Sequence, residues 1–177
     1  MPPITVRRIA ASDAAAYREA VLRSQARIAE WNPVDPDGFD NLLTANEAGA
    51  LVTYLVIDEV SGGIAARVNV SNIAHGRFQN ATLGYDGYDP YVGSGRTTAG
   101  LRMVVDECFR AQAHGGLGLH RLEINVQPAN ERSMALARRL GFRHEGRTPR
   151  MLFLDGEWRD HERFAITAEE WPVRSPA

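Results

Sequence analysis

The sequence contains no lysine: all 20 residues counted as Lys or Arg are arginine. This absence excludes chemistry that needs a side-chain amine: a Schiff base, a lysine general base and the lysine of a Walker-type phosphate loop. A single cysteine, Cys108, excludes an internal disulfide framework. The formal net charge is only −2, and no block of basic residues is present. We therefore expect no nucleic-acid partner, although the sequence alone does not exclude a local arginine patch.

Long hydrophobic runs are also missing. No apolar stretch approaches the roughly 20 residues that span a membrane, and the first residues lack the basic-then-apolar order of a secretory signal. We expect a cytoplasmic protein without a membrane partner. A metal site is not expected, because five histidines show no metal-ligand spacing with one another or with Cys108. They are His75, His114, His120, His144 and His161.

The composition is that of one globular domain. The chain has 177 residues, of which 44% are hydrophobic and 24% charged. A chain of about 150 residues buries roughly 70% of the surface that its unfolded form exposes, so neither disulfides nor a metal are needed for a core. No repeat or linker divides the sequence, and we expect a single domain over residues 1–177.

Hydrophobic periodicity predicts the elements of the first half. Ser12 is a suitable N-cap for a helix that runs to about Ala29, and Gly49 ends a second helix. Alternating or continuous apolar residues predict three strands. The expected ranges are a strand over 4–9, helices over 12–29 and 39–48, and strands over 51–57 and 64–70.

The second half continues the alternation of strands and helices. A helix whose apolar face includes Leu101 and Phe109 is stopped by Gly115, and a shorter helix is capped by Asn130 and closed by Gly141. The strands are expected over 81–88, 120–127, 151–154 and 158–166, the last two joined by a tight Asp155-Gly156 turn. This order predicts an α/β fold with a mixed sheet.

A glycine-rich loop precedes the clearest of these helices, with the sequence Gly93-Ser94-Gly95-Arg96-Thr97-Thr98. A strand that passes through such a loop into a helix can bind an anion, because free N–H groups and the positive end of the helix dipole face the same point. The loop is not a Walker motif, since it has no lysine. It is not a dinucleotide fingerprint either, since Thr98 replaces the third glycine. A plain connecting turn is an equally good interpretation of the glycines alone.

The segments that follow the loop carry a family resemblance. They are Arg121-Leu122-Glu123, Pro128 to Ser133 and Leu140-Gly141-Phe142, and the chain closes with Leu154 to His161 and Glu170-Trp171. In order and spacing they resemble the GNAT (GCN5-related) acetyltransferase superfamily. The ending, with Arg8-Ile9-Ala10 and Trp31-Asn32-Pro33, is similar to the RimJ/RimL type, the ribosomal-protein-alanine N-acetyltransferases.

The resemblance implies a single-domain GNAT fold: a mixed, twisted sheet flanked by helices, with a central pair of parallel strands, 81–88 and 120–127, that splay apart. It implies that acetyl-CoA lies in that cleft as cosubstrate, with its diphosphate on the loop, its pantetheine arm near Gly87 and a charge-assisted contact from Arg96. The implied cofactor-binding residues are Gly87, Val92, Gly93, Ser94, Gly95, Arg96, Thr97, Thr98 and Asn130.

The resemblance also implies the catalytic candidates. Asn130 is expected to hydrogen bond the cofactor, and Ser133 to relay a proton or contact the CoA thiolate. The alternatives are that Asn130 is only an N-cap and Ser133 only a tolerated small residue. The tyrosine acid and glutamate base of the RimI type are replaced by Ala137 and Asn125, and Ala99 replaces an acidic residue common after the loop. Glu123 is a candidate base acting through water, with a solvated strand carboxylate as the alternative.

Other candidates have a structural interpretation beside a functional one. Cys108, on the apolar face of its helix, is expected to be a packing thiol, since direct attack by an amine needs no covalent intermediate. His161 could bear on the substrate, although a histidine between Asp160 and Glu162 is typically a hydrogen-bonded structural residue. Trp31 and Trp158 could line an acceptor pocket, with core packing as the default.

The leading functional hypothesis is an acetyl-CoA-dependent N-acetyltransferase that modifies a protein α-amino group. Such an amine, with a pKa near 7.8, is roughly one-third neutral at about pH 7.5, against about one part in a thousand for lysine, so it needs little help from a base. The alternatives are acetylation of a small amine and a non-catalytic acyl-CoA-binding protein. Acidic residues at the acceptor mouth would favour a cationic small amine, with Asp35, Asp37, Asp86 and Asp89 as candidates. A homodimer is expected by family analogy.

Overall fold

A computed structural model describes residues 2–172, and within it the chain forms two compact units. Unit 1 comprises the described residues up to Ser71 together with Gly84–Val104, and unit 2 comprises Asn72–Leu83 together with the described residues from Val105 onward. Strands β3 (Ile64–Ala74) and β4 (Asn80–Gly87) and helix α3 (Arg96–Phe109) contribute residues to both units. The strands hydrogen bond in the order β1-β2-β3-β4-β5-β7-β6, which confirms the predicted α/β class with a mixed sheet.

Unit 1 is built on an antiparallel ladder. Strand β1 (Ile4–Arg8) pairs with β2 (Leu51–Asp58), and β2 pairs with β3. Helices α1 (Ala14–Ile28) and α2 (Phe39–Glu47) bury their apolar faces in the same core. That core consists of Tyr17, Ala20, Val21, Ile28, Phe39, Leu55, Ile64 and Tyr88. The alternating and continuous apolar runs of the sequence therefore form the predicted strands and helices of this unit.

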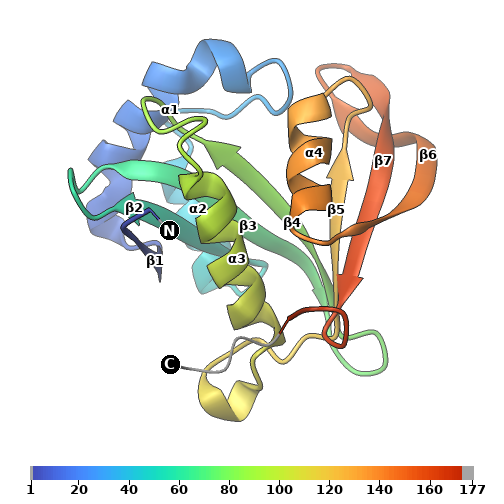
Figure 1. Cartoon of the computed structure of the whole chain (residues 1–177). Coiled ribbons are helices and arrows are strands. Elements are labelled where there is room, and N and C mark those ends of the chain that lie inside the picture. Colours follow the sequence, from blue (N-terminus) through green and yellow to red (C-terminus); the bar gives the residue numbers. More distant parts are fainter. Residues whose placement is uncertain (1, 173–177) are drawn as a thin grey trace. The chain divides into compact units, whose positions relative to one another are not determined.

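Unit 2 contains the parallel strand pair. The first residues of β4 pair with β5 (Arg121–Val126) from Asn80↔Arg121 to Thr82↔Glu123. Strand β5 also pairs antiparallel with β7 (Glu157–Thr167), and helix α4 (Glu131–Arg139) lies along β5 (Figure 1). Leu122, Ile124 and Val126 are buried while the residues between them are partly exposed, as the alternation of β5 predicts.

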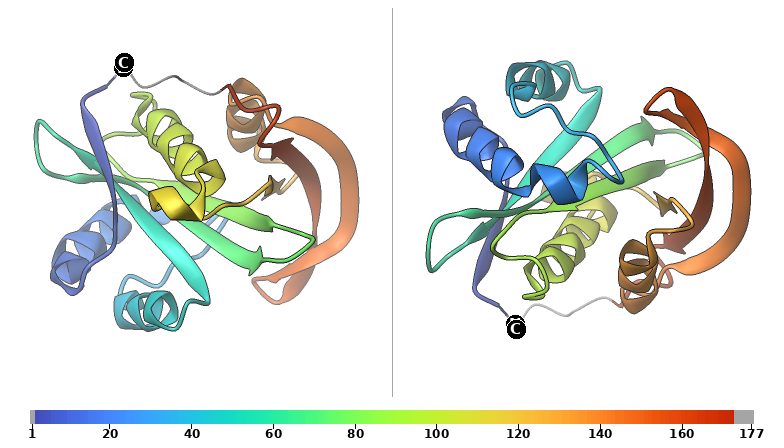
Figure 2. Two further views of the ribbon diagram at one scale, coloured as in Figure 1. Left: turned by 90° about the horizontal axis from the view of Figure 1, so that it is seen from below. Right: turned by 90° about the horizontal axis from the view of Figure 1, so that it is seen from above.

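Strand β6 (Arg143–Leu154) and β7 form a long hairpin, which is the orange and red pair in both views of Figure 2. Asp155 and Gly156 at its turn have φ values of 50° and 80°, as the predicted tight turn requires. The expected start at Met151 is wrong, because the strand begins eight residues earlier. Gly146 and Pro149 interrupt the pattern, and the register shifts between His144 and Gly146 and again before Leu152.

Two predicted helix ends also need correction. Helix α1 is preceded by a short 3-10 turn over Ala11–Asp13, so Asp13 takes the cap position expected for Ser12. The carboxylate of Asp13 accepts from the backbone N–H of Ala10 at 2.8 Å. Helix α3 ends at Phe109, and a separate 3-10 turn, Gln112–His114, leads to Gly115.

Candidate functional site

The glycine-rich loop of unit 1 joins the end of β4 to the start of α3. Gly93 and Gly95 have φ values of 81° and 82°, in the left-handed region that residues with a Cβ rarely adopt. The two glycines are therefore required by the backbone path of the loop. This requirement explains their spacing without yet implying a ligand.

The N–H groups of the loop divide into two sets. Ser94 turns inward, since its N–H donates to the carbonyl of Tyr91 at 3.1 Å and its hydroxyl donates to the same oxygen. Helix α3 begins at Arg96, and the first N–H groups of a helix have no intrahelical acceptor. The N–H groups at the start of α3 can therefore bind an anion, assisted by the helix dipole, whereas that of Ser94 is already used.

Gly87, Val92 and Thr97, three of the predicted cofactor-binding residues, come together at the end of β4. A Cβ on Gly87 would lie 2.8 Å from Oγ1 of Thr97 and 3.7 Å from Cγ2 of Val92. The carbonyl of Gly87 already accepts from Nη2 of Arg27 at 2.7 Å. The chain thus packs closely over Gly87, and the loop has no room for a side chain there.

Arg96, for which a charge-assisted contact to the cofactor is predicted, uses two of its nitrogens on a carboxylate of the protein itself. Its Nε donates to Oδ1 of Asp58 at 2.7 Å, and its guanidinium carbon lies 5.4 Å from the ring centroid of Tyr91. Asp58 was not singled out from the sequence. The pattern Asp58-x-x-Ser61 signals a turn, but nothing local links it to an arginine 38 residues later.

In unit 2, Asn130 is the N-cap of α4. Its Oδ1 accepts from the backbone N–H of Ser133 at 3.0 Å, which confirms the capping interpretation. Ser133 is partly buried and begins the apolar stripe that continues to Ala137 and Leu140, both buried. The cap thus fixes the backbone of Ser133, and the structure brings these two candidates together as neighbours on one helix turn.

Glu123 lies on the polar face of β5 among arginines. Nη2 of Arg121 lies 2.9 Å from its Oε1, and Nη2 of Arg163 lies 3.5 Å from its Oε2. Arg121 also pairs with Glu145 at 2.5 Å. Hydrogen bonds from Arg121 foremost, and from Arg143, lower the pKa of Glu145 to about 2. The ion pairs support the structural interpretation of the Glu123 carboxylate over that of a proton acceptor.

The two positions that depart from the RimI pattern, Ala137 and Asn125, also lie in unit 2. Ala137 is fully buried on α4 and offers no acid. On β5, the Oδ1 of Asn125 is buried without a hydrogen-bond partner among the described residues. An amide oxygen is a hydrogen-bond acceptor that does not take up protons near neutral pH, so Asn125 could orient a donor but not act as a base.

The remaining candidates have mixed outcomes. Cys108 is fully buried, and burial raises the pKa of its thiol, as expected for a packing residue. His161 is also buried, but its Nδ1 pairs with the carbonyl of Arg159 at 3.0 Å rather than with a neighbouring carboxylate. The core-packing default is wrong for Trp158, which is 60% exposed on the hairpin beside Phe153, while Trp31 is half-buried.

Three of the four candidate acids are held by arginines of unit 1. Asp37 pairs with Arg18 at 2.5 Å and Asp89 with Arg27 at 3.3 Å. Asp86 is buried against Arg67, and its other oxygen accepts from the side chain of Asn32 at 3.3 Å. The carboxylate of Asp35 accepts from the backbone N–H of Asp37 at 2.9 Å. Asp37, Asp86 and Asp89 therefore do not form an uncompensated negative surface.

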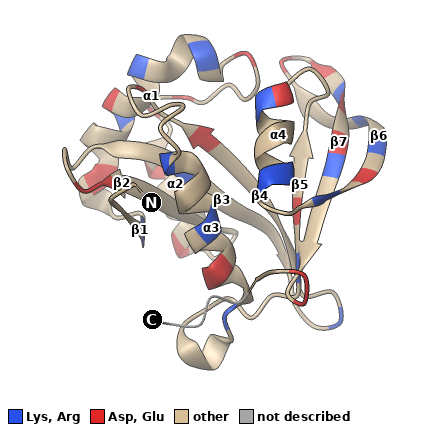
Figure 3. Ribbon diagram, viewed as in Figure 1, with Lys and Arg blue, Asp and Glu red and all other residues tan. Residues whose placement is uncertain are grey.

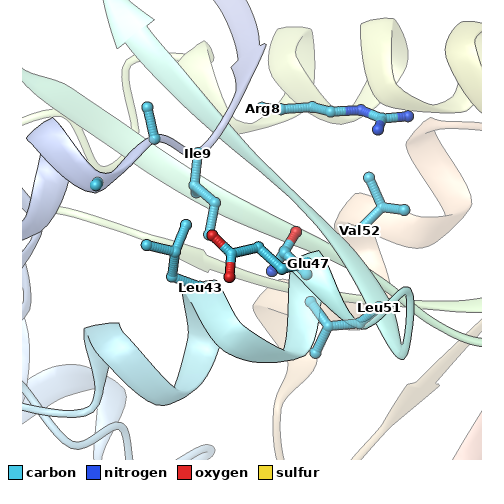
Figure 4. A pocket seen from close by; sticks show the side chains of 9 residues that line it. Arg8, Ile9, Leu43, Glu47, Leu51 and Val52 are labelled. Carbon is cyan, nitrogen blue, oxygen red and sulfur yellow. The ribbon is translucent and has the colours of Figure 1, made fainter.

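A separate pocket of about 310 Å³ in unit 1 shares none of its lining residues with the predicted site. It lies between the end of β1, the C-terminal half of α2 and the start of β2 (Figure 4). Its lining includes the apolar residues Ile9, Leu43, Leu51 and Val52 and the charged residues Arg8 and Glu47. Among residues 2–172, no helix is long and apolar enough to cross a membrane. Within the same residues, no group of three His, Cys, Asp or Glu side chains is placed to hold a metal ion.

Comparison with known proteins gives a consistent result. The family model described as an acetyltransferase (GNAT) domain matches residues 4–143. The [ribosomal protein uS5]-alanine N-acetyltransferase of Escherichia coli (strain K12) is 32% identical over 126 residues, which are 71% of this chain and 62% of that protein. The chain thus spans less than two thirds of the length of that relative.

Solved structures match over most of the chain. Mycobacterium smegmatis RimJ, in complex with CoA-disulfide, is 31% identical with a TM-score of 0.83, and the match covers 96% of this chain and 84% of that one. The ribosomal-protein-S5-alanine acetyltransferase of Vibrio fischeri is 26% identical with a TM-score of 0.82, covering 98% of this chain and 97% of that one.

Proposed function

Because the chain belongs to the GNAT acetyltransferase family, we propose that it is an acetyl-CoA-dependent N-acetyltransferase whose acceptor is the α-amino group of a protein. The observation that carries the proposal is the loop at the start of α3. Its glycines have left-handed φ values, its helix N–H groups lack intrahelical acceptors, and Gly87 packs against Thr97. The likeness to RimJ in complex with CoA-disulfide supports CoA as the ligand of this loop.

In the proposed reaction the acceptor amine attacks the acetyl thioester directly, the C–S bond breaks, and CoA leaves as a thiolate that takes up a proton. We assign Ser133 to that proton or to contact with the thiolate, and Asn130 to a hydrogen bond with the cofactor beside its capping role. Glu123 stays a candidate base through water, although its ion pairs favour a structural role. No covalent intermediate is needed, in keeping with the buried Cys108.

The absence of an obvious base favours an α-amine over a lysine side chain. Near pH 7.5 roughly a third of an α-amino group is in the neutral, nucleophilic form, against about a thousandth of a lysine side chain. The arginine pairing of Asp37, Asp86 and Asp89 argues against a polycationic small amine as the acceptor. Ribosomal proteins are the proposed substrates, because the E. coli and V. fischeri relatives carry that activity in their names.

We further propose that the enzyme is cytoplasmic, forms one domain and assembles as a homodimer. The exposed rings of Phe153 and Trp158, 5.6 Å apart on the hairpin, offer an apolar surface to a second copy. Light scattering would test the assembly: a dimeric wild type that becomes monomeric in Trp158→Ser supports this surface, and a monomeric wild type refutes it.

The activity is tested by thiol release from acetyl-CoA with peptides that carry a free or blocked α-amine, beside polyamines and amino sugars. Turnover confined to free α-amines and reduced in Ser133→Ala supports the proposal. Turnover on small amines alone would show that the acceptor is a small amine rather than a protein α-amino group. Tight acetyl-CoA binding without turnover on any acceptor would instead indicate a non-catalytic acyl-CoA-binding protein.

A further inference from the structure

One carboxylate in unit 1 reaches the segment on both sides of the loop glycines. Asp58, the last residue of β2, is only 2% exposed. Its Oδ1 lies 2.6 Å from Nη2 of Arg96, the first residue of α3 and the next after Gly95. The loop is thereby fixed on its C-terminal side to the turn between β2 and β3.

The other oxygen of Asp58 reaches the N-terminal side of the loop through Ser61. It accepts from the hydroxyl of Ser61 at 2.7 Å and from the backbone N–H of Ser61 at 3.0 Å. Oγ of Ser61 lies 2.6 Å from the hydroxyl of Tyr91, whose ring also lies under the Arg96 guanidinium. Tyr91 precedes Gly93, so one carboxylate organises the residues before and after the two glycines.

The charges explain why this arrangement is more than a surface ion pair. The Ser61 hydroxyl, the largest contribution, and Arg96 keep the pKa of Asp58 below its usual range, so the carboxylate is ionised near neutral pH. It compensates the charge of the Arg96 guanidinium and fixes the direction of that side chain at the start of α3. Because a loop held at both ends loses little further freedom on binding, its affinity for an anion is increased.

We propose that Asp58 is a positioning residue for the diphosphate of acetyl-CoA: through Arg96 on one side and Ser61 with Tyr91 on the other, it holds the loop in its binding conformation without touching the ligand. The inference rests on the proposed function, because it takes acetyl-CoA as the ligand of the loop. The competing interpretation is that the cluster contributes only to the stability of the fold.

The test compares two variants of the full chain, Asp58→Asn and Tyr91→Phe, with Glu59→Gln as the matched control. Glu59 follows Asp58 in the same turn, but its carboxylate accepts from the exposed hydroxyl of Thr5 at 2.7 Å and has no part in the loop. Calorimetry gives the Kd for CoA, and steady-state kinetics with saturating acceptor peptide give KM for acetyl-CoA and kcat.

We expect Asp58→Asn to raise Kd and KM about tenfold and Tyr91→Phe to raise both about threefold, the effects of losing a charged and a neutral hydrogen bond. We expect kcat to change less than about twofold in each, and Glu59→Gln to match the wild type. A purely structural role would lower the melting temperature and leave the Kd of the folded protein unchanged.

Three results would overturn the inference. They are an unchanged Kd in both folded variants, a fall in kcat at constant Kd, or an equal loss of affinity in Glu59→Gln. If Asp58→Asn does not fold, Tyr91→Phe decides, because it removes one hydroxyl and keeps the ring under Arg96. A wild-type protein that binds no CoA would instead refute the proposed function, so the two failures are distinct.

Discussion

Replacing Gly87 by alanine should perturb the loop through one contact. Gly87 does not have a left-handed φ, so alanine is compatible with the backbone there and only space opposes it. The added Cβ would lie 2.8 Å from Oγ1 of Thr97, where an ordinary contact begins at 3.4 Å. Thr97 is the second residue of α3, so its displacement moves N–H groups that we assign to the diphosphate.

The magnitude follows from the overlap. Thr97 must move by about 0.6 Å, the difference between 3.4 and 2.8 Å, and overpacking of this kind costs about 1–3 kcal/mol. If the cost falls on binding, the Kd for CoA rises about five- to 150-fold. If it falls on folding, the melting temperature drops by about 2–4 °C for each kcal/mol.

The assay is calorimetric titration with CoA beside thermal unfolding. Gly84→Ala is the matched control, because Gly84 lies on the same strand and a Cβ there would have no atom within 4 Å. The double variant Gly87→Ala with Thr97→Ala removes Oγ1 and leaves Val92 at 3.7 Å, so it should recover most of the loss. A double variant as impaired as Gly87→Ala, or an equal loss in Gly84→Ala, would refute the steric reasoning.

Three further predictions concern stability. In Gly100→Ala the new Cβ would overlap the side chain of Val56 and lie 2.9 Å from its Cγ1. Thermal unfolding should therefore show a loss of about 1–3 kcal/mol in the free energy of unfolding, which a second substitution, Val56→Ala, partly restores. An unchanged melting temperature would contradict this contact. Asn130→Ala removes the N-cap hydrogen bond and should lower the free energy of unfolding by about 1 kcal/mol, whereas Asn130→Ser should stay close to the wild type in the same assay. Equal losses of stability in both variants would argue against capping. Because ion pairing depresses the pKa of Glu145 from 4.5 to about 2, its stabilisation is present above pH 4.5 and lost as pH falls through 2. After allowance for solvent screening, denaturant unfolding at pH 7 should show that Glu145→Gln is about 1 kcal/mol less stable than the wild type, and this difference should disappear near pH 2. A difference that stays constant with pH would refute the ion-pair explanation.

Local patterns predicted the elements whose cause is local. Asn130 caps α4 because its side-chain oxygen can accept from the free backbone N–H three residues later, which requires nothing from distant parts of the chain. Asp155-Gly156 forms the turn of the hairpin because both residues adopt positive φ. The long strand β6 was mostly missed, since Gly146 and Pro149 break its period and its partner β7 supplies the pairing. Propensity could not reveal the first part of this strand, because residues 143–150 are mostly exposed and include three arginines and one glutamate beside a glycine and a proline (Figure 3).

The sequence indicates the candidate site only where its residues are contiguous. The loop from Gly93 to Thr98 is readable because its glycines and the helix after it are contiguous. The partners that fix it are not contiguous: Asp58 is 38 residues from Arg96, and Arg27 is 60 residues from Gly87. Such pairs depend on the three-dimensional path of the chain, so no periodicity or spacing rule could assign them.

The arginine-only composition gives the ion pairs of this protein an unusual chemical resistance. Among the described residues every salt bridge has a guanidinium or an imidazole opposite its carboxylate, from Arg67 with Asp86 in the core to Arg147 with Glu162 on the hairpin. Reagents that acylate side-chain amines, acetyl-CoA itself included, find no ε-amino group to modify. A preparation left with its own acetyl donor should therefore keep its network of charges, and acetyl label found on an internal peptide would lie on a hydroxyl, a thiol or an imidazole rather than on an ε-amino group.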